Sequence, residues 1–158
     1  MRMWGAVAIA AAAVILGAAG AAAPIAFPAG FRSWTHVSSA LLGEGGPPKY
    51  QGLHHIYGNR AAIEGLKSGR YADGAVFVYD QWTAGQVGAA TTAGERRFVD
   101  VMVRDSRRFA ATGGWGYAEF AAPDHRRVAE IEQDPQGSCH ACHERQATRG
   151  FVFSRWRD

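Results

Sequence analysis

The sequence predicts a single α+β domain that consists mainly of an antiparallel β-sheet with short helices. Segments rich in β-branched and aromatic residues recur along the chain, and turns rich in glycine and proline separate them. Only one segment carries a clear helical stripe of apolar residues. A chain of 158 residues suits one domain, because domains commonly hold about 100–200 residues. The sequence shows no internal repeat of fixed period.

The first 23 residues differ in composition from the rest of the chain. They carry one charged residue, Arg2, followed by an apolar run from Trp4 to Leu16 and an alanine-rich end. A basic start, an apolar centre and small residues at the end are typical of a signal peptide. An uncleaved membrane anchor is the alternative, but it needs about 20 apolar residues, and segments rich in alanine and glycine insert poorly. We therefore expect a signal peptide over residues 1–23, export to the periplasm and a domain over residues 24–158.

The first part of the domain predicts two strands and a loop. Residues 31–37 have the β-branched and aromatic character of a strand. Residues 41–52 include Pro47, Pro48 and several glycines, a composition that does not hold a regular element, so we expect a loop. A second strand is expected over residues 51–57.

The rest of the domain predicts one short helix and further strands. Asn59 is a suitable N-cap for a helix that ends at Gly69 and has an apolar stripe of Ala62, Ile63 and Leu66. Strands are expected over residues 75–79, 97–103 and 115–120, which are rich in valine and aromatic residues. Four or five strands with few helices favour an antiparallel sheet.

The distribution of charge along the chain does not favour a nucleic acid as a partner. The net charge is +3 at pH 7, and the basic pairs lie far apart, at Arg96-Arg97, Arg107-Arg108 and Arg126-Arg127. These pairs are not interleaved with aromatic residues that could stack on bases, so a nucleic-acid surface is not expected. A solvated surface is the simpler interpretation, and an acidic redox partner protein stays open as an alternative.

The two cysteines of the chain lie in one motif, Cys139-His140-Ala141-Cys142-His143. The spacing Cys-x-x-Cys-His is the one used to attach c-type haem. Two thiols three positions apart lie on adjacent helical turns and can add to the two haem vinyl groups, and His143 then faces the iron as the proximal ligand. His140 is expected to be solvated. We predict one covalently attached haem c, with the second ring nitrogen of His143 held by an acceptor that the sequence does not identify.

The motif has three alternative interpretations: a redox dithiol, a structural disulfide and half of a zinc site. A zinc site would need further cysteines or a second pair of histidines at ligand spacing, and the sequence offers none. The histidine directly after Cys142, in a chain expected to be exported, favours haem over all three.

The sequence also bears on the other axial position of the iron. No methionine follows His143, and Met102 is the only methionine beyond the leader. Met102 lies inside a strand-like run, where core packing is favoured over ligation. We therefore expect an open or water-bound iron.

Four residues are candidates for the distal side of the haem. They are His54, His55, Phe77 and Tyr79, because side chains alternate along strands and place Phe77 and Tyr79 on one face. Either histidine could instead be buried and hydrogen-bonded or face a haem propionate. Phe77 could be ordinary core, and Tyr79 could pack with its hydroxyl at the rim.

The chain resembles the cytochrome P-460 and cytochrome c′-beta family of exported mono-haem cytochromes. The resemblance runs from about Phe31 to Arg155 and is carried by residues 31–34, 67–69, 73–78, 105–110, 139–143 and 152–155. It implies a mainly antiparallel β fold, a homodimer and five-coordinate haem with a histidine as the proximal ligand.

The two branches of this family differ at one position. The P-460 branch oxidises hydroxylamine and nitric oxide with a haem cross-linked to a lysine, whereas cytochrome c′-beta binds nitric oxide in an apolar pocket capped by phenylalanine. The resemblance puts the place of the cross-linking lysine at Tyr79, so the lysine cross-link is not expected here. Lys67 matches a different family lysine and is expected to be solvated. His54 and His55 would make the pocket more polar than in cytochrome c′-beta.

Three functions follow as hypotheses. The first is a periplasmic haem protein that binds nitric oxide and acts in nitrogen-oxide detoxification. The second is a hydroxylamine or nitric oxide oxidoreductase in which His54, His55 and Tyr79 assist the chemistry, the histidines by helping proton transfer, with an external electron acceptor. The third is an electron-transfer cytochrome in which Met102 or a histidine is the sixth ligand.

Overall fold

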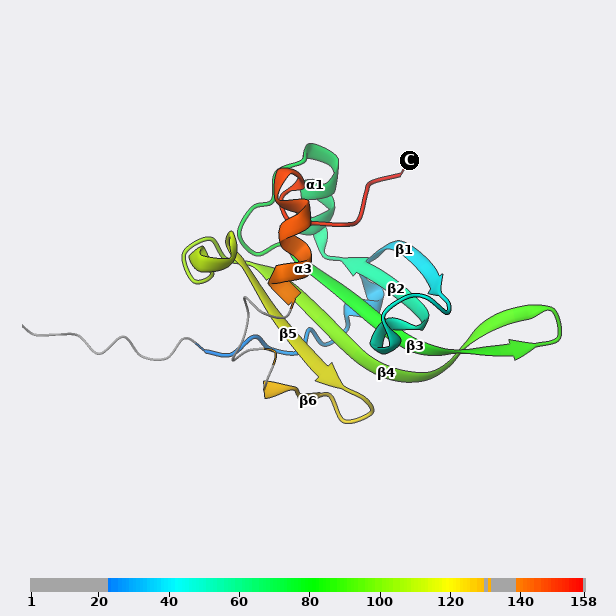
Figure 1. Cartoon of the computed structure of the whole chain (residues 1–158). Helices are drawn as coiled ribbons and strands as arrows, with labels where there is room; N and C mark the ends of the chain where they lie inside the picture. The colour runs from blue at the N-terminus through cyan, green and yellow to red at the C-terminus, as the bar shows by residue number, and fades with distance from the viewer. Residues whose placement is uncertain (1–22, 130, 132–138, 158) are drawn as a thin grey trace, which may run out of the picture.

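The computed structural model describes residues 23–129, 131 and 139–157, so the predicted signal peptide lies outside the described residues except for its last residue, Ala23. Six antiparallel strands form one sheet in which each strand pairs with the next along the chain (Figure 1). The strands are β1 (Thr35–Leu42), β2 (Gly52–Gly58), β3 (Val76–Val87), β4 (Ala90–Arg104), β5 (Trp115–Ala121) and β6 (Arg126–Arg127). This meander confirms the predicted α+β class with a mainly antiparallel sheet.

The helical elements are short and lie between or after the strands. They are η1 (Phe31–Ser33), η2 (Pro48–Tyr50), α1 (Arg60–Ser68), η3 (Ala110–Thr112), α3 (Ala141–His143) and η5 (Glu144–Arg149). Within the described part of the chain, no helix has the length and apolar character needed to cross a membrane.

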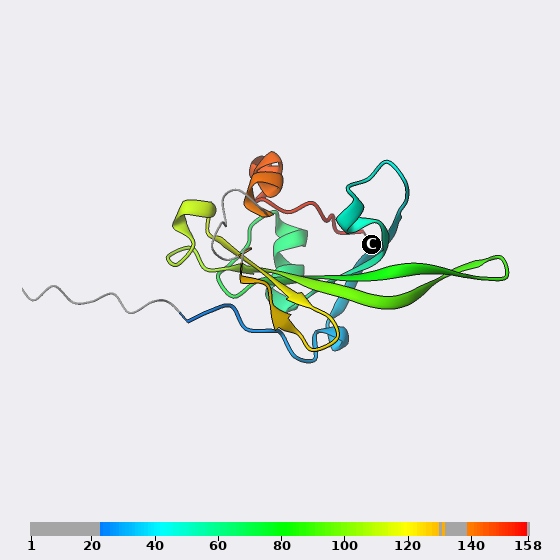
Figure 2. The same cartoon turned by 60° about the horizontal axis from the view of Figure 1, so that its bottom comes forward.

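The sheet has two faces, each covered by a different part of the chain. We call the face under α3 the motif face; on it lie Phe77, Phe98, Met102 and Tyr117, and Cys139 packs against the cluster that includes Phe77, Met102 and Tyr117. The back face carries Val78, Val99, Val101, Ala118 and Phe120, which pack with Ile25 and Phe31 of the N-terminal segment. Figure 2 shows α3 and the N-terminal segment on opposite sides of the sheet.

The predicted first strand is wrong at its start. Phe31–Ser33 forms η1 instead, because Gly30 adopts a left-handed φ of 77° and the amide of Trp34 donates to the carbonyl of Phe31. The turn buries Phe31 to 3 % exposure on the back face. The strand begins only at Thr35 and runs on to Leu42, so the predicted loop is shorter than expected and includes η2.

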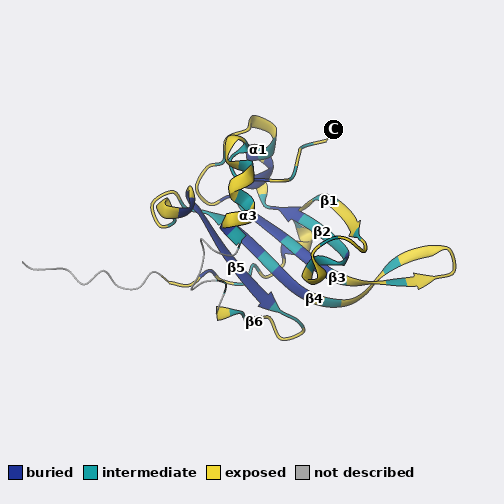
Figure 3. Cartoon of the chain, in the orientation of Figure 1, coloured by how far each residue is buried: buried dark blue, intermediate teal, exposed yellow. Residues whose placement is uncertain are grey.

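The predicted strands over residues 75–79 and 97–103 are confirmed, but they are parts of longer strands. β3 and β4 continue as a two-stranded arm that projects from the sheet, with pairs such as Ala84–Ala93 and Gln86–Thr91. Most of the arm is exposed on both faces (Figure 3). Its residues are mainly alanine, glycine and threonine, so it lacks the apolar alternation by which strands are found in a sequence.

The predicted helix cap is confirmed at both ends of α1. Asn59 Oδ1 accepts hydrogen bonds from the amides of Ala62 (2.9 Å) and Val76 (3.1 Å), and Asn59 Nδ2 donates to the carbonyl of Gly74 (2.9 Å). Gly69 ends the helix with a left-handed φ of 74°. One side chain therefore joins the start of α1 to the start of β3.

Replacing Asn59 with alanine should lower the free energy of unfolding by about 2–3 kcal/mol, because a cap and two further hydrogen bonds are lost together. Urea denaturation of the two proteins measures this difference. Asn59→Asp keeps the acceptor oxygen and should cost less. Equal stability of Asn59→Ala and the parent protein would show that the cap contributes nothing.

Candidate haem site

The motif segment is helical. His140 has helical dihedral angles (φ −61°, ψ −43°), and α3 leads into η5, which is kinked at Gln146 (φ −108°, ψ 19°) and ends at Gly150 with a φ of 67°. The two motif cysteines therefore lie about one turn apart, as attachment to two vinyl groups requires. Cys139 is partly buried, Cys142 is exposed, and neither thiol is in a disulfide.

The second ring nitrogen of His143 has a defined acceptor. Its Nδ1 lies 2.7 Å from the carbonyl oxygen of Phe151. Because a carbonyl only accepts, Nδ1 carries the proton, and the lone pair is on Nε2, where an iron ligand needs it. Gly150 and Phe151 both have a φ of 67°, and this left-handed turn brings the Phe151 carbonyl back over the helix. The sequence offered no sign of this partner, since it is a backbone atom.

Burial favours the neutral form of His143. Desolvation lowers the pKa of its imidazole, the bond to Phe151 acts in the opposite direction, and His140 adds a smaller lowering. A neutral imidazole is the form that binds iron. The ring lies 5.2 Å from the ring of Tyr117 and edge-on to Phe153 at 5.1 Å.

His140 is not solvated, contrary to the sequence expectation. It is 8 % exposed and lies between Tyr117 and Phe151, with ring centroids 6.2 Å and 5.5 Å away. The reason is that the motif helix lies on the sheet, so the residue after Cys139 points inward.

The motif face is ordered in rows that cross the strands. The pairing of β2 to β5 puts Phe77, Met102 and Tyr117 in one row, Tyr79, Asp100 and Glu119 in the next, and His54, Gln81 and Phe98 in the third. The first row lies beside Cys139 and is apolar. The second and third rows are mainly polar, so the motif face has an apolar end and a polar end.

Three of the four predicted distal residues share the motif face. Phe77 is 6 % exposed and packs with Met102 and Trp115. The rings of Tyr79 and His54 are stacked, with centroids 4.5 Å apart. His55 points to the back face, where its ring is near Tyr57. The structure therefore brings His54, Phe77 and Tyr79 together and separates His55 from them.

Met102, the methionine considered as a sixth ligand, is 7 % exposed and packs in the same apolar cluster as Phe77. Its contacts are those of a core side chain.

The polar end of the motif face holds a pair of acidic residues that sequence reasoning missed. Asp100 and Glu119 are direct neighbours across β4 and β5, and Glu119 forms an ion pair with Lys49. The pKa of Asp100 is well above its ordinary value, first because burial disfavours the charge and next because Glu119 is close; Lys49 acts in the opposite direction. Asp100 therefore holds a proton beside a carboxylate that Lys49 neutralises.

Tyr79 and Tyr50 lie beside this acidic pair. Burial raises the pKa of both phenols, and the nearby Asp100 raises both further. Their rings meet edge-on at 5.7 Å. The phenols remain protonated at neutral pH and can donate hydrogen bonds.

The loop that carries Lys49 and Tyr50 is fastened to the sheet by buried Gln81. Its Nε2 donates to the carbonyls of Gln51 (3.0 Å) and Tyr50 (3.3 Å), and Arg97 Nη1 donates to Gln51 at 3.0 Å. These bonds hold the loop over the polar end of the motif face.

Four buried polar atoms of the motif face and the motif helix have no hydrogen-bond partner within the described residues: His54 Nδ1, Asp100 Oδ1, Tyr117 OH and His140 Nδ1. Leaving such atoms unpaired is costly, so they indicate a missing polar group. A haem, whose apolar ring bears two carboxylates, fits a face with one apolar and one polar end. Cys139 and Cys142 would hold its vinyl groups, and His143 would hold its iron.

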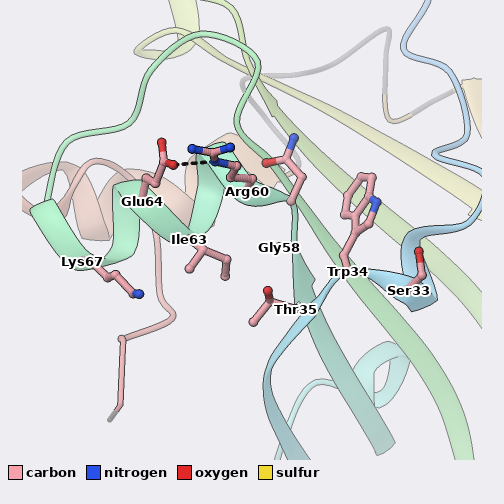
Figure 4. A pocket seen from close by; sticks show the side chains of 9 residues that line it. Ser33, Trp34, Thr35, Gly58, Arg60, Ile63, Glu64 and Lys67 are labelled. Carbon is pink, nitrogen blue, oxygen red and sulfur yellow. Dashed lines mark hydrogen bonds and ion pairs between the residues drawn. The ribbon is translucent and has the colours of Figure 1, made fainter.

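A pocket elsewhere on the molecule is separate from this site. It lies between α1 and the start of β1, and Figure 4 shows Trp34, Arg60, Ile63 and Lys67 around it. None of the predicted site residues lines it. Lys67, expected to be solvated, is exposed and has its ammonium 4.3 Å from the centroid of the Trp156 ring.

An antiparallel sheet that carries a helical Cys-x-x-Cys-His segment is the arrangement expected of a haem-binding c-type cytochrome. The family model for cytochrome P460 matches residues 28–154, and the chain belongs to the cytochrome P460 family. A search of curated proteins gave no match.

Proposed function

We propose that this protein is a periplasmic cytochrome with one covalently attached haem c, which binds nitric oxide opposite His143 and acts in nitrogen-oxide detoxification. The observation that supports this most is the geometry of His143, whose Nδ1 is held by Phe151 and whose Nε2 is left for iron. No methionine follows the motif, and Met102 packs as core. A bound iron would thus have His143 as its protein ligand and could take an external ligand.

Haem iron, when bound, supplies the atom that coordinates nitric oxide and exchanges electrons. The chain itself supplies the surroundings. Phe77 and Met102 keep one end of the face apolar and exclude water. His54 and Tyr79 lie at the polar end and have hydrogen-bonding atoms to offer to a bound ligand.

Hydroxylamine or nitric oxide oxidation is a second candidate function, and the acidic pair favours it. Hydroxylamine loses protons as it is oxidised, so a site for this reaction needs groups that accept protons. Asp100 already holds a proton, so Glu119 is the member of the pair that would accept one beside Tyr79, with Lys49 as its ion-pair partner. Electrons would pass to an external acceptor, for which a redox partner protein is proposed.

Anaerobic titration of the reduced protein with nitric oxide tests the main proposal. The absorption spectrum should change with a stoichiometry of one nitric oxide per haem. His54→Ala should increase the rate at which nitric oxide dissociates by about three- to tenfold, the loss of roughly one hydrogen bond. His55→Ala is the matched control, since His55 lies on the other face, and should leave this rate unchanged. A spectrum that nitric oxide does not alter would refute the proposal.

The same preparation distinguishes the second function. Steady turnover of hydroxylamine with a dye acceptor, reduced in His54→Ala but not in His55→Ala, would support an oxidoreductase. Absence of turnover in a protein that binds nitric oxide would leave ligand binding as the function.

The assembly and the haem linkage are also open to measurement. The homodimer implied by the family resemblance predicts twice the monomer mass in light scattering. Because the family resemblance puts Tyr79 at the place of the cross-linking lysine, the intact mass should equal the polypeptide plus one haem. A mass lower by further lost hydrogens would indicate an additional bond to the haem.

A further inference from the structure

Three polar side chains meet on the back face, near the edge of the sheet. His36 Nε2 lies 2.8 Å from Ser39 Oγ, and the same oxygen lies 2.6 Å from His55 Nδ1. A serine hydroxyl has one proton, so it donates to only one of these nitrogens, and the other imidazole donates to it. Two imidazole nitrogens therefore point at one oxygen atom from different strands.

The backbone places these residues together by a local irregularity. Ser39 pairs directly with His55, which pairs with Asp80, so the three form a row across β1, β2 and β3. His36 is three positions before Ser39 and would lie on the other face if side chains alternated regularly. A bulge between His36 and Ser38 shifts the register and returns His36 to the face of Ser39. Bulges commonly re-aim side chains in this way at functional sites.

Burial, more than the nearby charges, keeps the imidazole of His55 neutral. Burial lowers the pKa of its imidazole; buried Asp80 acts in the opposite direction, and His36 and Arg32 add smaller lowerings. A neutral imidazole keeps a lone pair for a metal. Asp80 is fully buried and paired with Arg96 at 2.8 Å, and Arg32 lies over the ring of Trp82. The negative charge of Asp80 is thus partly balanced under the site.

We propose that His36 and His55 bind a divalent transition-metal ion of the Zn²⁺ or Cu²⁺ type. Imidazole nitrogens suit these ions, whose bonds to nitrogen are about 2.0–2.1 Å long for zinc. The described residues offer no group of three His, Cys, Asp or Glu at a metal position, so the Ser39 hydroxyl and water complete the coordination. His36 and Ser39 are exposed, which gives the ion access from solvent.

This site is independent of the proposed haem function, because it lies on the opposite face of the sheet. The test uses the purified haem protein, titrated with Zn²⁺ by calorimetry and with Cu²⁺ by electron paramagnetic resonance. We expect one tight ion per chain and a copper signal split by two nitrogens. His36→Ala and His55→Ala should each weaken binding at least about tenfold, since loss of even an outer-shell partner of a metal ligand commonly costs that much.

His125→Ala is the matched control, because His125 is an exposed imidazole at the β5–β6 turn and should not affect the ion. His36→Gln guards against misfolding, since His36 is exposed and the haem spectrum reports whether the fold is intact. Binding that persists in His36→Gln and His55→Ala, a copper signal from one nitrogen, or no tight ion at all would each overturn the proposal. None of these outcomes alters the nitric oxide titration.

Discussion

A protein in which Cys139 and Cys142 are both replaced by serine should carry no covalent haem. A hydroxyl does not replace a thiolate as the nucleophile that adds to a vinyl group, and the chain has no other cysteine. Haem staining of a denaturing gel, followed by extraction with acidified acetone, measures covalent attachment. We expect full retention of haem in the parent protein and complete loss in the double variant.

His140→Ala is the control for this experiment. It changes the motif but keeps both thiols and His143, so covalent haem should be retained. Haem that stays with the polypeptide after both cysteines are removed would show that attachment depends on another residue.

Above the pH range in which an ordinary carboxyl group titrates, the free energy of unfolding of the parent protein should depend on pH. Asp100→Asn should remove most of that dependence. Asp100 has a raised pKa in the folded protein, so the folded state holds a proton that the unfolded state loses at about pH 4. The contribution of Asp100 to stability is therefore complete below about pH 4, and it is lost as the pH rises toward the raised pKa of Asp100. For one proton the slope is about 1.4 kcal/mol per pH unit.

Urea denaturation at a series of pH values measures this slope. The amide that Asp100→Asn introduces is neutral and similar in shape to the protonated carboxyl group, so the variant should give a flatter profile and higher stability at neutral pH. Glu95→Gln, at an exposed position in β4, should keep the parent profile. If Asp100→Asn shows the same slope as the parent protein, the proton is not held on Asp100.

Much of the sheet could be predicted because its central strands either alternate between apolar and polar residues or are apolar throughout. The strand over residues 115–120 and the helix cap at Asn59 both have strong local signals. The arm of β3 and β4 does not, because its small residues bury nothing and only cross-strand hydrogen bonds make it a strand. The strand expected at Phe31 became a turn because burial of that ring outweighed its strand propensity.

The haem motif was visible in the sequence because its residues are adjacent in the chain. The Phe151 acceptor was not, since a carbonyl has no sequence signature. Asp100 and Glu119 could have been noticed, because each is an acidic residue inside an apolar strand. Asp100 also lies two positions before Met102 and therefore on the same face of the strand. Reading them together requires the register between β4 and β5, which a sequence alone does not supply.

His54 and His55 show the same limit of prediction from sequence. Alternation along β2 requires that His54 and His55 face opposite sides, but it does not say which side carries the haem motif. That choice depends on where the segment after β6 returns to the sheet.

The most direct test of the whole account is the absorption spectrum of the reduced protein before and after carbon monoxide is added. One haem held by His143, with no second protein ligand, predicts a high-spin spectrum that carbon monoxide converts to a low-spin one. A low-spin spectrum that carbon monoxide leaves unchanged, as two strong protein ligands would give, would contradict the account.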